Sequence, residues 1–475
     1  MSLHRRQQSW RAVGTLAVTL LSTFLATVPV LAQDAAPKVD TGDTAWILTS
    51  AALVLLMTPG LAFFYGGLVR GKNVLNTIMM SFVALAVIGL QWVLFGYSLA
   101  FSDGSPFIGG LSWLGLNGVG QEPSPLYMAT VPHQAFMVYQ GMFAIITPAL
   151  ISGALVGRMK FKTYVVFIIL WATLVYDPLA HWVWSLGDPA VKGWLGNLGA
   201  LDFAGGTVVH ISAGVSALVA ALILGARKGY PERPMPPHNV PFVILGAGLL
   251  WFGWFGFNAG SAGAANGLAA AAFVNTNTAT AAAVATWLLV ESLFAKPTAV
   301  GAATGAVVGL VAVTPAAGFV TPLGSIAIGG IAAIACYGMV QLRTKLKYDD
   351  SLDVFGCHGV GGIVGAVLTG VFATKAVNSA GADGLLYGNP GLVVTQLIAV
   401  LATVVLAVVG TSVILFVLKV VMGLRPDEQD ELNGLDITEH GEEGYIGLAG
   451  GYSISDSSGE GREPSPELRM RTSQE

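Results

Sequence analysis

The chain has 475 residues, of which 54% are hydrophobic and only 11% are charged, and its mean hydropathy is +0.69. A soluble protein carries about 25% charged residues, so this composition excludes a soluble globular fold and indicates that lipid is the solvent. The net charge of −4 gives no basis for a nucleic-acid partner. Cys336 and Cys357 lie in apolar stretches and predict small core residues, neither a disulfide nor a metal site.

The N-terminus has the pattern of a secretory signal peptide. Three arginines within the first eleven residues form a basic region, residues 12–31 are apolar, and a small-residue cleavage pattern ends at Ala32. We therefore predict a signal peptide over residues 1–32 and a mature chain that starts outside the cytoplasm. The apolar run is longer than usual, so the alternative is a signal anchor that stays attached.

Eleven apolar runs of about membrane length follow. We predict spans near residues 44–67, 75–101, 131–156, 161–183, 204–225, 239–261, 268–294, 299–315, 320–341, 355–373 and 392–422. The chain is therefore predicted to be an all-α integral membrane protein whose transmembrane domain occupies residues 33–424.

The distribution of basic residues tests this count independently. Alternate loops contain 14 lysines and arginines: Arg70, Lys72, Arg158, Lys160, Lys162, Arg227, Lys228, Arg233, Lys296, Arg343, Lys345, Lys347, Lys419 and Arg425. The intervening loops contain only Lys192 and Lys375. Cytoplasmic loops are the basic ones, so this bias predicts an N-out, C-in topology with eleven transmembrane helices.

The span count also predicts an internal repeat. Five spans followed by five more have opposite orientations, which is the inverted-topology arrangement of many transporters, and one C-terminal helix remains. The candidate fifth and tenth spans open with similar segments, which start at Asp202 and Asp353. Each segment is followed by one histidine, His210 or His358.

The chain becomes polar after Leu424. Residues 425–452 begin with an acid-rich stretch, and we predict that they form a cytoplasmic tail. Residues 453–475 are rich in Ser, Glu and Arg, contain two prolines, and have too few apolar residues to fold. We predict that this last segment is disordered.

The two histidines are the main functional candidates, because ionisable residues inside a membrane are costly. A single buried histidine is a hydrogen-bonded core residue about as often as it is a functional one. One histidine in each half of the repeat favours a functional pair. Burial favours the neutral ring, which donates from one nitrogen and accepts at the other. His210 and His358 are therefore predicted to bind a small polar molecule or share a proton. A metal site is the weaker alternative, since no third ligand is evident.

Aromatic residues gather at the outer end of the sixth span, in the run from Trp254 to Ser261. Such residues usually form an interface belt. Aromatic faces also attract a cation by about 0.5–2 kcal/mol, and the Ser261 hydroxyl adds an acceptor. Phe143 and Trp184 lie near the outer ends of other spans, so a cage for a small cation is the competing interpretation.

Asp202 lies at the start of the fifth span. A carboxylate there caps a helix by accepting from free backbone amides. The functional alternative is a fixed negative charge that favours a cation at the mouth, and both interpretations can hold together.

Motifs in order along the chain resemble those of the Amt/Mep/Rh family of ammonium channels. Segments similar to the family's fifth-helix, sixth-helix and tenth-helix motifs are 202–210, 253–261 and 353–359. Parts of its third, fourth and sixth helices and its cytoplasmic tail motif resemble 139–143, 180–184, 237–239 and 434–442. The resemblance covers residues 43–447.

The resemblance implies a role for the residues near the outer mouth. Phe143, Trp184 and Ser261 would bind ammonium there. Phe143 would also stack with Phe257 as a gate beneath this site. The loop between Trp184 and Asp202 is longer than the family pattern, which puts the shape of the mouth in doubt.

The resemblance also implies roles deeper in the pore and for the assembly. His210 and His358 would be the paired pore histidines, Trp254 would line the pore wall, and Asp202 would support recruitment and deprotonation. The implied assembly is a homotrimer in the cell membrane, with a PII-type signal protein as the partner of the cytoplasmic tail.

The function predicted from these residues is ammonium transport without a cofactor. Ammonium would bind at the outer cage, lose a proton and pass the histidines as ammonia, with or without separate proton transfer. One alternative is an Rh-like channel for another neutral gas such as carbon dioxide, and a second is an ammonium sensor. No G-x-S-x-G, Walker A or zinc spacing occurs, so we predict that the chain is not an enzyme.

Overall fold

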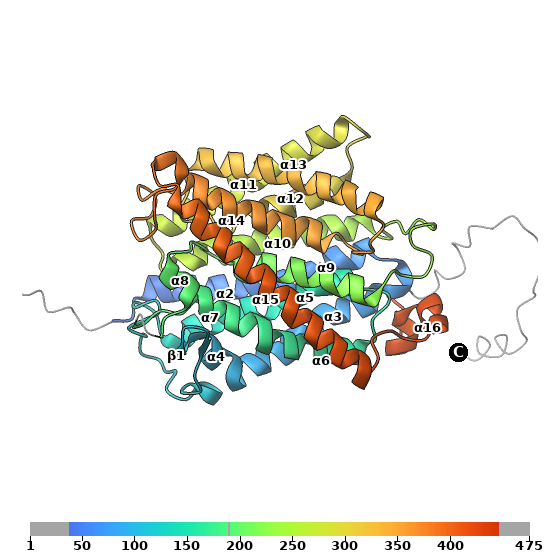
Figure 1. The fold of residues 1–475 in the computed structure, drawn as a ribbon, viewed down its shortest axis with the longest axis horizontal. Coiled ribbons are helices and arrows are strands. Elements are labelled where there is room, and N and C mark those ends of the chain that lie inside the picture. The colour runs from blue at the N-terminus through green and yellow to red at the C-terminus, as the bar shows by residue number, and fades with distance from the viewer. Residues whose placement is uncertain (1–37, 189–190, 446–475) are drawn as a thin grey trace, which may run out of the picture.

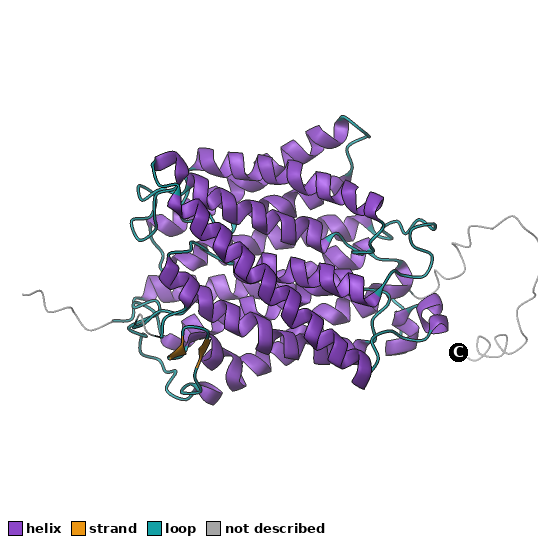
Figure 2. Cartoon of the chain, viewed as in Figure 1, coloured by secondary structure: helices purple, strands orange, loops and turns teal. Residues whose placement is uncertain are grey.

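The computed structural model describes residues 38–188 and 191–445, so the predicted signal peptide and the predicted disordered tail lie outside the described residues. The long helices run side by side in one bundle, with connecting loops gathered at its two ends (Figure 1). Helices make up most of the described chain, and its strands are confined to one small hairpin at one end of the bundle (Figure 2). The predicted all-α fold is confirmed.

Among the residues that the structure describes, seven long helices are uninterrupted: α2 (Thr41–Leu68), α5 (His133–Leu155), α10 (Val240–Ala259), α11 (Gly267–Ser292), α12 (Ala299–Val313), α13 (Pro322–Leu346) and α15 (Gly391–Val421). Polar side chains cap the starts of all of them except α5 and α15. Asp40 accepts from the backbone nitrogen of Asp43, and Asn239 accepts from that of Phe242. Thr298 and Thr321 cap α12 and α13 in the same way, which satisfies amides that have no partner within the helix.

Four other membrane segments contain a π-helical turn. The second consists of η1 (Gly71–Asn73), α3 (Val74–Gln91), η2 (Trp92–Gly96) and α4 (Tyr97–Phe101), and the fourth of α6 (Phe161–Trp171), η4 (Ala172–Tyr176) and α7 (Asp177–Trp184). The fifth consists of η5 (Gly206–Ile211) and α9 (Ser212–Leu224), and the tenth of η7 (Phe355–Gly359) and α14 (Val360–Phe372). π-helical turns of this kind are often found at functional sites.

The remaining elements are short and lie in the connections. The hairpin consists of β1 (Gly104–Ser105) and β2 (Ile108–Gly109), and the short helices are η3 (Leu114–Leu116), α8 (Trp194–Leu198), η6 (Gly260–Ala262) and η8 (Leu385–Tyr387). The tail adds α16 (Glu428–Asn433) and η9 (Asp436–His440).

Within the described residues, ten helical segments are long and apolar enough to cross a membrane, and each falls on one of the eleven predicted spans. The remaining predicted span, 299–315, corresponds to the shorter apolar helix Ala299–Val313. The exact count of eleven and the N-out, C-in topology therefore stay predictions.

Close packing inside the bundle depends on glycines. A methyl group on Gly246 of α10 would lie 2.3 Å from the backbone nitrogen of Phe64 in α2, so only glycine allows these two helices to approach. The outer surface carries large apolar side chains such as Leu323 and Val420, which are 78% and 87% exposed. A surface of this kind is stable in lipid and would aggregate in water.

Candidate functional site

The two predicted histidines meet inside the bundle. His210 belongs to η5 and His358 to η7, and their Nδ1 atoms lie 3.3 Å apart. The rings are nearly parallel, with centroids 5.3 Å apart and planes at 25°. Both are buried, at 1% and 3% exposure. A contact between two Nδ1 atoms needs one N–H donor and one lone pair, so the rings take complementary tautomers.

Glycines allow the histidine turns to lie this close. A methyl group on Gly214 would lie 2.1 Å from the backbone nitrogen of Gly359, the residue after His358. A methyl group on Gly362 would lie 3.0 Å from the carbonyl oxygen of Gly206. Any larger side chain at these crossings would move the helices apart and separate the rings.

A narrow cavity runs along the histidine pair. It is lined by His210, His358, Trp254, Phe257 and otherwise apolar side chains. Its free volume is about 10 Å³ measured to the centre of a water-sized molecule, which is room for one such molecule. Nε2 of His210 has no hydrogen-bond partner among the described residues, so it can bind a small polar molecule.

Two phenylalanines close one end of this cavity. The rings of Phe143 and Phe257 have centroids 4.2 Å apart and planes tilted by 32°. Both residues are buried, at 1% and 0% exposure. The ring of Phe257 also lies 6.0 Å from that of His210, so the closed stack lies next to the histidine pair.

The predicted outer residues lie on the other side of the phenylalanine stack. The ring of Trp184 is edge-on to Phe143 at 6.2 Å, and Trp184 and Ser261 are both partly exposed. Ser261 donates to the carbonyl of Phe257 at 2.9 Å and contacts the hydroxyl of Tyr139 at 3.1 Å. Trp184 therefore contacts Phe143 and Ser261 is bonded to Phe257. Their role as a cage for a cation stays a prediction.

Asp202 caps η5. Its Oδ1 accepts from the backbone nitrogens of Gly205 and Gly206 at 2.8 and 2.6 Å. Its Oδ2 accepts from the backbone nitrogen of Thr207 at 2.7 Å and also from the Thr207 hydroxyl. Both carboxylate oxygens are therefore engaged by the helix start, and the capping role predicted from the sequence is confirmed.

The equivalent carboxylate of the tenth span is Asp350 and not Asp353, which the sequence comparison paired with Asp202. Asp350 precedes His358 by eight residues, as Asp202 precedes His210, and its Oδ2 accepts from the backbone nitrogen of Phe355 at 2.7 Å. Asp353 has a left-handed backbone, with φ of 57°, and forms an ion pair with Arg343 at 2.9 Å. Burial raises the pKa of Asp353 to about 7, against the opposing charge of Arg343.

A wider cavity lies beside the histidine cavity. This cavity has a volume of about 300 Å³ and shares Phe64, Val307 and His358 with the narrow one. Its lining includes the carboxylates of Glu291 and Asp353. The two cavities are therefore neighbours, separated by the side chains that line both.

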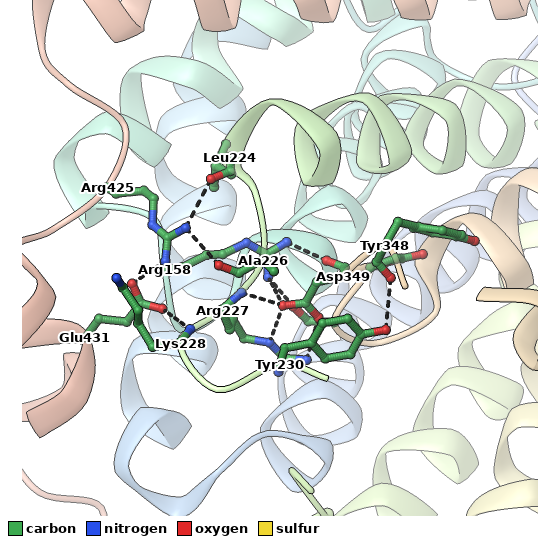
Figure 3. A network of polar contacts seen from close by, with 12 residues as sticks. Arg158, Leu224, Ala226, Arg227, Lys228, Tyr230, Tyr348, Asp349, Arg425 and Glu431 are labelled. Carbon is green, nitrogen blue, oxygen red and sulfur yellow. Dashed lines mark hydrogen bonds and ion pairs between the residues drawn. The ribbon is translucent and has the colours of Figure 1, made fainter. Parts of the chain in front are cut away.

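A buried ionic cluster joins those loops (Figure 3). Asp349 accepts from Arg227 Nη2 at 2.8 Å and from Arg158 Nη1 at 3.1 Å. Burial opposes the charged form of Asp349, but the hydrogen bonds from Arg227 and the charge of Arg158 hold its pKa below the ordinary value. In the same cluster Glu431 of the tail pairs with Arg425 at 2.5 Å.

The tail follows an ordered path across the ends of the helices. The carboxylate of Asp436 accepts from the backbone nitrogens of Leu75 and Asn76 at 3.0 and 2.8 Å. The hydroxyl of Tyr445 contacts Nε2 of His238 at 2.8 Å. A cavity of about 780 Å³ lies between this tail and the loops around Arg70 and His238.

Sequence reasoning missed several of these residues. Asp350 was detectable, since counting eight residues back from each histidine finds an aspartate in both halves. Tyr139 and the cluster around Asp349 gave no such signal, because their partners lie more than 100 residues away. Among the residues that the structure describes, no group of three or more His, Cys, Asp or Glu side chains could hold a metal ion.

Comparisons with known proteins agree on one family. The model of the Ammonium Transporter Family matches residues 45–445. The chain is 53% identical to the ammonium transporter of Bacillus subtilis (strain 168), over 85% of this chain and 98% of the relative. It is 52% identical to the ammonium transporter of Aquifex aeolicus (strain VF5), over 92% of this chain and 99% of the relative.

Solved structures give the same result. The crystal structure of Saccharomyces cerevisiae Mep2 superposes with a TM-score of 0.76 at 39% identity, over 82% of this chain and 89% of that one. A structure described as a sensor Amt protein superposes with a TM-score of 0.77 at 28% identity, over 84% of this chain and 98% of that one.

Proposed function

The chain belongs to the ammonium transporter family, and from that premise we propose that it binds ammonium ion, removes a proton and conducts ammonia. One observation carries this proposal: two histidines in contact at 3.3 Å line an apolar cavity behind a closed pair of phenylalanines. Family membership supports ammonium as the substrate.

Recruitment takes place at the outer opening. The faces of Phe143 and Trp184 attract the cation, and the Ser261 oxygen accepts one of its N–H groups. Potassium has a similar size and the same charge, so this site alone does not separate the two ions. Selectivity therefore requires a later step.

Deprotonation provides that step. Moving a bare ion through an apolar cavity costs tens of kcal/mol in the Born limit, whereas the aromatic contacts return about 0.5–2 kcal/mol. Ammonium can give a proton to water at the outer opening, which leaves neutral ammonia to pass the stack of Phe143 and Phe257. Potassium has no proton to lose and does not pass. The carboxylate of Asp202, engaged by the start of η5, acts on the cation through its negative charge and not by contact.

The histidine pair then binds ammonia in the narrow cavity. Nε2 of His210 has no protein partner and is available to it. Since the two Nδ1 atoms share one N–H, a proton can pass between the rings, and transport becomes electrogenic if the proton follows the ammonia. Trp254 keeps the rings in place, because it stacks on His210 at 5.4 Å and donates to Thr314 at 2.8 Å.

The assembly and its regulation are further parts of the proposal. We assign the protein to the cell membrane as a homotrimer with one pore per subunit and a cytoplasmic C-terminus. The ordered tail from Arg425 to Tyr445 serves as a docking surface for a PII-type signal protein. The alternative, an ammonium sensor, is supported by the likeness to the sensor Amt protein.

Currents recorded on supported membranes from purified, reconstituted protein test the proposed transport. Wild type should give current with ammonium and none with potassium. Replacement of both His210 and His358 by leucine should abolish the ammonium-specific current, because the cavity loses its only imidazoles. A carbon dioxide flux assay on the same vesicles tests the gas-channel alternative. If the double variant still carried selective ammonium current, the histidine relay would have to be abandoned.

A further inference from the structure

His181 lies in α7, three residues before Trp184, and both of its ring nitrogens face backbone carbonyl oxygens. Nδ1 lies 3.0 Å from the oxygen of Ala100, and Nε2 lies 2.7 Å from that of Ser105. The residue is fully buried. A carbonyl oxygen only accepts, so each nitrogen must donate, whereas a neutral imidazole has a single N–H.

From this geometry we propose that His181 is a buried imidazolium and a positioning residue for the outer aromatic site. The double donation ties α7 to two other segments, α4 through Ala100 and the β1–β2 hairpin through Ser105. The link to substrate binding rests on the proposed recruitment role of Trp184, whereas the charge on His181 rests on geometry alone.

The position in the helix favours a positive charge. His181 lies in the last turn of α7, where the helix dipole stabilises a cation. Asp177 lies one turn earlier in the same helix segment and, in the part of the chain that the structure describes, forms no hydrogen bond with His181. Asp177 is fully buried, its Oδ2 accepts from Gln91 at 2.7 Å, and its Oδ1 has no hydrogen-bond partner among the described residues.

The wider surroundings are acidic. The acidic and basic groups on the elements packed against α7, or directly beside those elements, are Asp103, Asp177, Asp188, Lys192 and Asp202. The other titratable groups on these elements are Tyr97, Tyr176 and His210. Burial of His181 opposes a charge, so the second proton depends on the two carbonyl oxygens that the ring nitrogens face.

The segments that His181 joins pack against the helix that carries Trp184. Ala100 is the penultimate residue of α4, where carbonyl oxygens lack partners within the helix. Trp182, next to His181, donates to the hairpin carbonyl of Phe107 at 2.7 Å. Two consecutive residues therefore hold the last turn of α7, which carries Trp184, to the hairpin. Of these two, His181 has a side chain that titrates and Trp182 does not.

Histidine ¹⁵N NMR of the reconstituted full chain tests the charge directly. The signals that disappear in His181→Gln identify the ring. In wild type at neutral pH, both of these nitrogens should be of the protonated type. A signal from a non-protonated His181 nitrogen at neutral pH would overturn the proposal, whatever the transport activity.

Transport kinetics test the positioning role. His181→Phe should raise KM for ammonium about tenfold with little change in kcat, since it removes two bonds from a charged donor. Wild-type KM should rise at the pH where NMR shows that the ring loses its second proton. His181→Gln keeps donor groups but does not titrate, so it should restore most of the affinity and remove this pH dependence.

Trp182→Phe provides the matched control, because it deletes a hairpin hydrogen bond without changing the charge. Its KM should keep the wild-type pH dependence. If His181→Gln showed the same pH profile as wild type, the positioning role would be refuted. If NMR showed the imidazolium but KM were unchanged in His181→Phe, the charge would stand and the link to Trp184 would fail.

Discussion

Trp184 donates its indole N–H to the backbone carbonyl of Asp202 at 2.9 Å. Trp184 is thus bonded to the residue whose carboxylate caps η5, the turn that contains His210. The proposed recruitment site and the histidine pair are therefore joined through Asp202, and substitutions at Trp184 should have two separable effects.

Comparing Trp184→Phe with Trp184→Ala separates these effects. Phenylalanine keeps an aromatic face but loses the bond to Asp202, whereas alanine loses both. We expect Trp184→Ala and Ser261→Ala each to weaken ammonium binding by about 1–2 kcal/mol at most, with conduction retained. Measured KM values check this, with Trp184→Phe between wild type and Trp184→Ala. Unchanged KM in both alanine variants would show that these residues are only an interface belt.

Asp202→Asn should destabilise the protein. The asparagine amide has one acceptor oxygen where the carboxylate has two, and its NH₂ group would face backbone N–H donors. We expect a loss of about 1–3 kcal/mol, seen as a lower melting temperature in detergent. Asp350→Asn should behave similarly because Asp350 has the equivalent position in the other half. A melting temperature equal to wild type in both variants would argue against the capping role.

The ionisation of Asp353 predicts a pH dependence of stability. Its pKa in the folded protein is raised to about 7, so between pH 4 and 7 the folded state binds more protons than the unfolded state. The contribution of Asp353 to the free energy of unfolding is therefore fully present at low pH and is lost as the pH rises toward 7. Asp353→Asn should melt like wild type at pH 5 and higher than wild type at pH 8. The opposite order at pH 8 would show that the ion pair with Arg343 dominates.

Two truncations test the tail. A chain that ends before Gly434 loses Asp436, which binds the first turn of α3, and Tyr445, which binds His238. A chain that ends before Ser453 keeps them. We expect the first truncation to reduce transport and abolish PII pull-down, and the second to resemble wild type. Asp436→Asn isolates the main contact. Equal behaviour of the two truncated proteins would remove the case for a regulatory tail.

The helical architecture could be predicted because lipid imposes a simple rule. A membrane segment must satisfy its own backbone hydrogen bonds, so long apolar runs become helices and their limits follow from polar residues such as Asp40 and Asn239. The exception is the helix Ala299–Val313, whose 15 residues are fewer than a membrane-spanning helix usually has. The π-helical turns could not be predicted, since they depend on tertiary contacts such as that between Gly214 and Gly359.

The candidate site was predictable where residue type is unusual for its surroundings. His210 and His358 are polar residues in apolar spans, and they meet. The residues that follow Asp353 and Asp202 are similar, which suggests that these two aspartates are equivalent. The spacing from the histidine is the better criterion, and it identifies Asp350 as the equivalent of Asp202. The hydrogen bonds of His181 could not be predicted from the sequence, because a histidine followed by Trp-Val-Trp is equally typical of a helix end at the membrane interface.

The closed contact between Phe143 and Phe257 has a consequence for speed. At a centroid separation of 4.2 Å the rings leave no gap, so every molecule that passes must wait for them to part. Ring and loop rearrangements in packed interiors take far longer than diffusion across a water-filled hole. The protein should thus admit one molecule each time the rings part. Its flux should therefore saturate and rise steeply with temperature.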